Sequence, residues 1–102
     1  LFFGTTNEFQ QLAAQVPDSA SIVVIRMGRM QYMDQSGLYA MEDVLQEQKR
    51  KNITVLLVNI LDQPRYMMER IDIIPDLIPN EHIFKNFKNC MRWLSEHLNE
   101  AN

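Results

Sequence analysis

The chain has 102 residues and a mass of 12.0 kDa, which is the length of one domain. Hydrophobic residues make up 46% and charged residues 23%, a globular composition that excludes a disordered chain. The formal net charge of -3 argues against a nucleic-acid-binding protein, because such proteins need a concentrated basic surface. We therefore expect one folded domain over residues 1–102, with no nucleic acid among its partners.

The apolar tracts of this sequence are too short to cross a bilayer. The longest are four-residue runs such as Ile22–Ile25 and Val55–Val58, whereas a membrane span needs about 20 apolar residues. The sequence starts at Leu1 without an initiator methionine, and it lacks the charged start and apolar stretch of a signal peptide. We expect it to be part of a longer protein.

The first element expected is the end of a strand, Leu1–Phe3, followed by an amphipathic helix. The apolar residues of this helix repeat at intervals of three and four, and they are Phe9, Leu12, Ala13 and Val16. One of residues 5–7, all Thr or Asn, is expected to cap the helix, and Pro17 is expected to end it.

Two strands and a helix between them are expected next. Ser21–Met27 and Ile53–Ile60 are apolar without alternation, as in strands that are buried on both faces. Gly37–Lys51 is expected to be helical, with one apolar face made of Leu38, Met41, Val44 and Leu45. A helical crossover implies that the two strands are parallel, and Asn52 is suited to a left-handed turn between helix and strand.

The last third of the chain is expected to contain two more helices. One runs from about Pro64 to Ile71, and the prolines at positions 75 and 79 predict a turn or a short irregular helix after it. The final helix reaches about Leu98, with an apolar face packed on the sheet and made of Phe84, Phe87, Met91, Leu94 and Leu98. Alternating strands and helices predict an α/β fold.

Reactive groups are sparse, so we expect neither an enzyme nor a metal site. The two histidines, His82 and His97, belong to no metal-binding motif, and Cys90 lies about 10 Å from His97 along a helix, too far for a nucleophile and its base. Three glycines are too few for a phosphate-binding loop. We expect no cofactor.

The segment Met33–Leu38 stands where a strand leads into the central helix. Asp34 is placed to cap that helix, and Gly37 permits close backbone packing. Gln35 and Ser36 then lie at the positive end of the helix, where a phosphate or an acidic partner group is favoured. The residues alone favour the capping role over a binding role.

The pattern Asp-x-Ser-Gly-Leu at Asp34–Leu38 resembles the signature of the STAS domains (sulfate transporter and anti-sigma factor antagonist). The order of elements is similar as well, with a buried strand before the loop and a helix and a second buried strand after it. Within the family, the chain is most similar to the cytoplasmic C-terminal domain of bacterial sulfate permease (SulP) transporters. This similarity rests on Leu1-Phe2-Phe3-Gly4, on Tyr39-Ala40-Met41-Glu42 and on Ile83-Phe84 before the last helix.

The resemblance implies a STAS fold, a central β-sheet with parallel crossovers flanked by amphipathic helices. It implies a non-catalytic regulatory and protein-interaction domain of a secondary anion transporter, at the cytoplasmic face of the bacterial inner membrane. Its partners would be the membrane domain of the same transporter and a cytoplasmic protein. The contact surface would be the signature loop, which comprises Asp34, Gln35, Ser36, Gly37 and Leu38. Bicarbonate, sulfate and dicarboxylate are equally compatible as the transported anion.

The alternative is a free-standing anti-sigma factor antagonist in a partner-switching pathway. In such antagonists a kinase phosphorylates a serine or threonine directly after the motif aspartate. Here that position is Gln35, which accepts no phosphate, although Ser36 has a hydroxyl one position later. This departure favours the transporter branch.

Family members begin with a strand that would precede Leu1, so the first strand is expected to be truncated here. A sheet without it would expose an unpaired edge through which two chains can pair. A dimer formed in that way would be an artefact of truncation.

Overall fold

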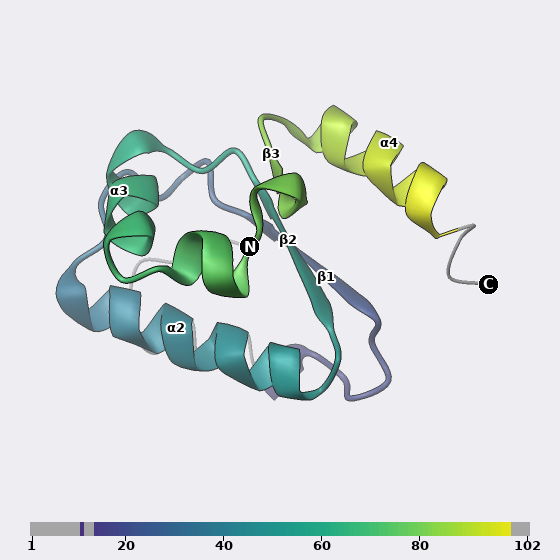
Figure 1. The fold of residues 1–102 in the computed structure, drawn as a ribbon, viewed down its shortest axis with the longest axis horizontal. Helices are drawn as coiled ribbons and strands as arrows, with labels where there is room; N and C mark the ends of the chain where they lie inside the picture. The colour runs from purple at the N-terminus through teal and green to yellow at the C-terminus, as the bar shows by residue number, and fades with distance from the viewer. Residues whose placement is uncertain (1–10, 12–13, 99–102) are drawn as a thin grey trace.

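A three-stranded parallel sheet forms the centre of the molecule (Figure 1). The computed structural model describes residues 11 and 14–98. The strands β1 (Ile22–Arg26), β2 (Thr54–Val58) and β3 (Ile83–Phe84) lie in the order β1-β2-β3. The register places Ile22 opposite Thr54, and Leu57 opposite Ile83. The predicted strands over residues 21–27 and 53–60 and their parallel pairing are confirmed.

The helices follow the predicted order. They are α2 (Gln35–Arg50), α3 (Asp62–Arg70) and α4 (Phe87–His97). The irregular helix predicted after α3 is confirmed: the segment Ile73–Leu77 is helical except at Ile74, whose backbone is extended. A 3₁₀ turn, Asn80–His82, then leads into β3. The fold is thus α/β, as predicted.

The turn after α2 shows why this helix ends where the sequence predicts. Lys49 and Arg50 occupy its last turn, where cations face the negative end of the helix dipole. Asn52 follows with a φ of 59°, the left-handed conformation that asparagine tolerates better than most residues. The chain then enters β2, and the amide of Thr54 donates to the carbonyl of Ser21 at 2.9 Å.

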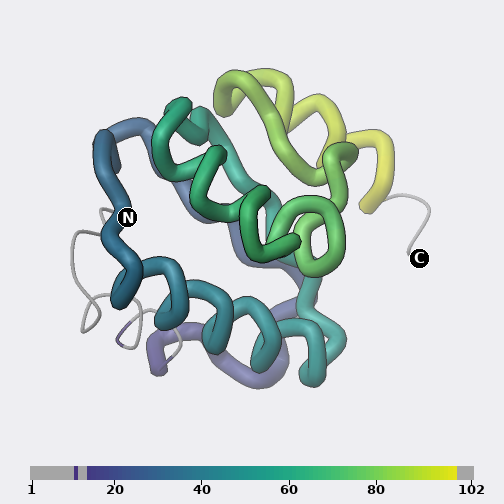
Figure 2. The backbone as a smooth tube through the Cα atoms, turned by 60° about the vertical axis from the view of Figure 1, so that its left-hand side comes forward, coloured from purple at the N-terminus to yellow at the C-terminus, as the bar shows by residue number. Residues whose placement is uncertain are grey.

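The larger hydrophobic core lies on the face of the sheet that α2 and α3 cover (Figure 2). Side chains alternate along β2, so Val55 and Leu57 belong to this core while Leu56 and Val58 belong to the opposite one. From the helices, Met41 and Met68 are both buried in the larger core. This core fixes the start of α2 against the sheet.

A smaller core joins the opposite face of the sheet to α4. Its α4 side chains are Cys90, Trp93 and Leu94. The apolar face predicted for this helix is therefore wrong in part, because Phe87, Met91 and Leu98 are 36%, 48% and 47% exposed. Both sides of α4 are apolar, and the sheet packs against the side that carries Cys90.

Two further expectations concern the ends of elements. Phe84 belongs to β3 and not to the final helix, which begins at Phe87 after the cap residue Asn86. In the predicted first helix, Gln11, Ala14 and Gln15 are helical. Its cap at residues 5–7, most of its apolar face (residues 9, 12 and 13) and the predicted strand end at residues 1–3 lie outside the described residues.

Candidate functional site

Residues 27–33 connect β1 to the signature loop, which forms the capped start of α2. Asp34 has an extended backbone, and its carboxylate accepts a hydrogen bond from the amide of Gly37 at 2.7 Å. The amide of Leu38 donates to the Asp34 carbonyl at 2.9 Å, which is the first helical hydrogen bond. The predicted capping role of Asp34 is confirmed, and it satisfies one of the free amides of the first turn.

The five signature residues divide between core and surface. Leu38 is 3% exposed and belongs to the larger core, and Gly37 beside it is buried as well. Asp34, Gln35 and Ser36 are exposed. The signature therefore anchors the helix with its last two residues and presents the first three to solvent.

A side chain from α3 holds the loop from the other side. The Gln63 carbonyl oxygen accepts from the amide of Met33 at 2.6 Å, and its amide nitrogen donates to the carbonyl of Met33 at 3.0 Å. These two bonds pair one side chain with both backbone groups of Met33, as a neighbouring strand would. Sequence reasoning missed Gln63, because a glutamine 30 positions away carries no motif that points to this loop.

A shallow hollow of about 280 Å³ lies beside the exposed half of the signature. Gln35 and Tyr39 line it from α2, and Met67 and Arg70 line it from α3. The Gln35 amide donates to the Tyr39 hydroxyl at 3.2 Å, and the Arg70 guanidinium lies 5.7 Å from the ring centre of Tyr66. The hollow thus joins the signature loop to an aromatic and cationic surface on α3.

All three tyrosines of the chain are strongly exposed. Tyr32 is 71% exposed just before the loop, Tyr39 is 47% exposed on α2, and Tyr66 is 57% exposed on α3. Tyrosine, methionine and arginine are enriched at protein interfaces, since they combine large apolar area with hydrogen-bonding groups. The composition of this surface suits contact with another protein better than binding of a small molecule.

The contacts of the two histidines and of the cysteine are those of packed side chains. Trp93 stacks on His97 with 3.9 Å between ring centres and meets the edge of His82 at 5.3 Å. Burial lowers the pKa of His82, while Glu81 opposes that shift and His97 adds to it. Burial also raises the pKa of the Cys90 thiol, so Cys90 packs as a small apolar residue.

Within residues 11 and 14–98, no three His, Cys, Asp or Glu side chains come together as a metal site would require. Over the same part of the chain, no helix has the length and apolarity needed to cross a bilayer.

The family model of the STAS domain matches residues 1–99 of this chain. Comparison with curated protein sequences gave no match. Several solved structures match the fold of this chain.

Three of these structures share the fold of this chain at low sequence identity. A sulfate transporter family protein from Wolinella succinogenes has a TM-score of 0.80 and 17% identity, over 96% of this chain and 80% of that one. The STAS domain of a SulP transporter from Vibrio cholerae has a TM-score of 0.76 and 16% identity, over 95% and 74%. SLC26A9 has a TM-score of 0.74 and 17% identity, over 99% of this chain but 19% of that one. With its sequence match over residues 1–99 and its parallel sheet flanked by helices, the chain belongs to the STAS domain family.

Proposed function

We propose that this chain is the cytoplasmic, non-catalytic regulatory and protein-interaction domain of a SulP-family secondary anion transporter. Membership of the STAS family supports the proposal, as does a fold shared with a sulfate transporter family protein and with the STAS domain of a SulP transporter. Its partners would be the membrane domain of the same transporter and a cytoplasmic protein. The domain would lie at the cytoplasmic face of the bacterial inner membrane.

The observation that carries the proposal is the exposed half of the signature loop beside the hollow. Gln35 and Ser36 face solvent at the start of α2, and the buried Leu38 and the Gln63 bonds to Met33 hold them in place. A contact surface held in one conformation loses little entropy when a partner binds. We infer that Asp34, Gln35 and Ser36 form the contact, while Gly37 and Leu38 support it from the core.

The free-standing antagonist is not favoured. Its phosphorylation switch needs a hydroxyl directly after the motif aspartate, and Gln35 supplies an amide there. The amide of Gln35 is instead hydrogen-bonded to Tyr39, along the edge of the hollow.

Ser36→Asp in the full-length transporter tests the regulatory contact. We expect uptake to fall several-fold while the unfolding temperature of the domain stays unchanged or rises slightly. The physical reason is that a carboxylate in the first turn of α2 is favourable for the helix but alters the charge of the contact surface. Uptake of labelled sulfate, bicarbonate and succinate in cells that express equal amounts of transporter provides the measurement.

Ser19→Asp is the matched control, because Ser19 is also exposed and lies before β1, at the end of the strand opposite to the loop. It adds the same charge and should leave uptake unchanged. If Ser36→Asp transported at the wild-type rate and bound the membrane domain as well as wild type does, the loop would have no regulatory role.

A further inference from the structure

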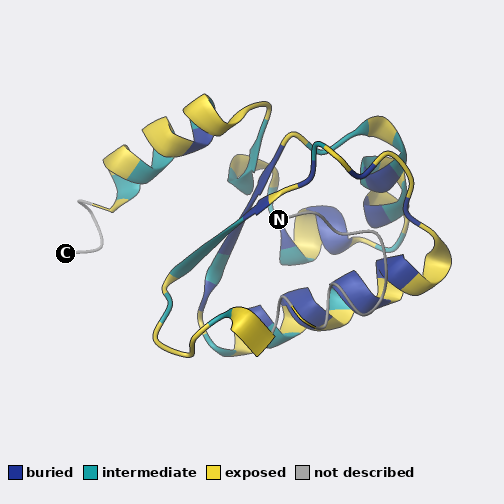
Figure 3. Ribbon diagram, turned by 180° about the vertical axis from the view of Figure 1, so that it is seen from behind, coloured by how far each residue is buried: buried dark blue, intermediate teal, exposed yellow. Residues whose placement is uncertain are grey.

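The outer side of α4 carries a row of exposed apolar side chains. Phe87, Met91 and Leu98 are spaced by four and seven positions, so they lie on one side of the helix, and they are 36%, 48% and 47% exposed. The inner side of the same helix packs on the sheet through Cys90 and Trp93. Figure 3 shows the outer side of α4 exposed along its whole length. This row serves neither the core nor the signature loop.

Cations border the apolar row. Lys88 and Arg92 are exposed and lie beside Met91 on the helix surface. No acid occurs between Lys85 and Ser95. A chain with a formal net charge of -3 therefore presents a local positive surface here. The only acid of α4 is Glu96, near its end.

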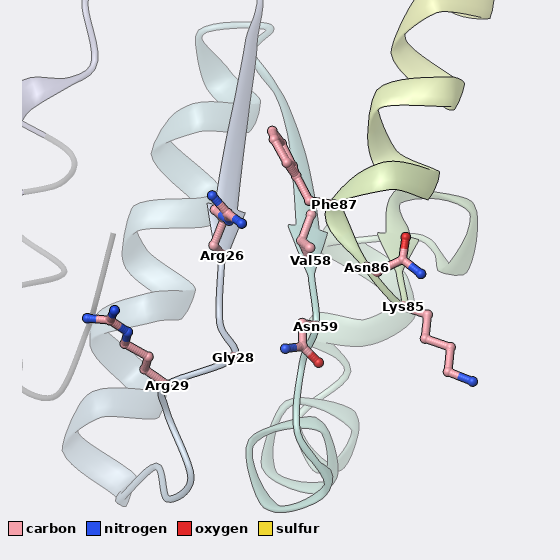
Figure 4. Close-up of a pocket in the computed structure, with 8 residues that line it drawn as sticks. All are labelled: Arg26, Gly28, Arg29, Val58, Asn59, Lys85, Asn86 and Phe87. Atoms are coloured by element: carbon pink, nitrogen blue, oxygen red, sulfur yellow. The ribbon is translucent and has the colours of Figure 1, made fainter.

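Further cations lie where β1 and β3 lead out of the sheet. A crevice of about 750 Å³ there is lined by Arg26 at the end of β1, by Arg29 after it and by Lys85 before α4, with no acid among the described residues of its wall. The Arg26 guanidinium lies 4.5 Å from the ring centre of Phe87, which connects the crevice to the apolar row. Figure 4 shows Arg29 and Lys85 on opposite sides of Asn59, pointing away from each other and outwards.

The cations of this surface spread over a broad area and do not converge on one point. A closed site for a single phosphate would need donors that converge on one point. The headgroups of a bilayer form a flat layer, and cations that point outwards can bind them. Five of the ten Lys and Arg residues of the chain lie on this surface, and they are Arg26, Arg29, Lys85, Lys88 and Arg92. We name this surface, together with Phe87, Met91 and Leu98, the α4 face.

We propose that the α4 face docks on the surface of an anionic phospholipid bilayer. The apolar row enters the boundary between headgroups and acyl chains, and the neighbouring cations contact lipid phosphates. The inference rests on the proposed function, since a domain of a membrane transporter lies beside such a surface. A projecting helix with an apolar row and flanking cations suits a flat bilayer better than an acidic protein, because the bilayer accommodates both the apolar row and the cations.

Vesicle binding by the 102-residue chain tests this docking. The chain should sediment with vesicles that mix phosphatidylglycerol and phosphatidylcholine, should not sediment with phosphatidylcholine alone, and should bind more weakly as salt rises. Lys88→Gln with Arg92→Gln should lower the partition coefficient about 30-fold, because each cation near an anionic surface strengthens binding about fivefold and the variant loses two of them. Met91→Ser should weaken binding without a change in charge.

Lys49→Gln with Arg50→Gln is the matched control, since it removes the same charge from α2 on the opposite face of the sheet. It should bind as wild type does, and circular dichroism should show all variants folded. Equal binding to both kinds of vesicle, no binding, or equal loss in the control would overturn the proposal. Binding of polyglutamate without binding of vesicles would also overturn it and assign the α4 face to an acidic protein. The vesicles contain no transporter, so a negative result would overturn membrane docking without bearing on the proposed function. The Ser36→Asp uptake experiment tests that function independently.

Discussion

Replacing Leu57 by alanine is expected to lower the free energy of unfolding by about 2–5 kcal/mol. Leu57 is 0% exposed on the central strand and faces the larger core. Met41 and Met68 of the same core belong to helices that pack on the sheet, so the cavity left by the substitution closes only in part. Urea denaturation followed by far-UV circular dichroism measures the loss.

Leu56→Ala is the matched control for this prediction, because Leu56 is equally buried on the same strand but faces α4. Within the described residues, the core beneath α4 has three buried members. The helix can therefore move toward the smaller side chain and fill part of the cavity. We expect a loss near the lower end of the same range, about 2 kcal/mol, with a change in the fluorescence of Trp93, the single tryptophan. A greater loss for Leu56→Ala than for Leu57→Ala would contradict the division into a larger and a smaller core.

Replacing Leu38 by alanine is expected to cost about 2–5 kcal/mol as well. Leu38 is 3% exposed in the larger core, and alanine keeps the helix propensity of α2, so the whole loss comes from burial. Asp34→Ala should cost about 1 kcal/mol through the lost cap, and Asp34→Asn should restore most of it because asparagine caps equally well. Thermal unfolding of the three variants provides the comparison.

Tyr39→Ala is the control next to Leu38, since Tyr39 is exposed, and its effect should stay within about 0.5 kcal/mol. A wild-type unfolding temperature for Leu38→Ala would show that the signature is not anchored through the core. The loss in free energy of unfolding should be largest for Leu38→Ala, smaller for Asp34→Ala and smallest for Tyr39→Ala. The division of the signature between core and surface requires this order.

The parts of the fold that were predicted correctly have strong local signals. The strands β1 and β2 are unbroken β-branched and apolar runs, and α2 has a cap residue, a regular apolar face and a cationic end. Asp34 and Asn52 carry their conformational preferences in their own side chains. The resemblance to the family identified Asp34–Leu38 as a signature and predicted the STAS fold.

The parts that were missed depend on contacts distant in the sequence. The strand β3 has two residues, too few for any alternation, and it exists because Ile83 and Phe84 pair with β2. The helix α4 is apolar on two sides, so periodicity alone does not decide which side meets the sheet. The bonds from Gln63 to the loop form only when α3 packs beside α2, which no spacing in the sequence encodes.

The most direct test of the proposed function is to sequence the parent reading frame upstream of Leu1. A transporter requires about ten or more apolar stretches of about 20 residues each before this domain. We expect to find them, with a short connection leading into Leu1. A short leader that ends in a single strand would contradict the proposal and make the chain a free-standing STAS protein.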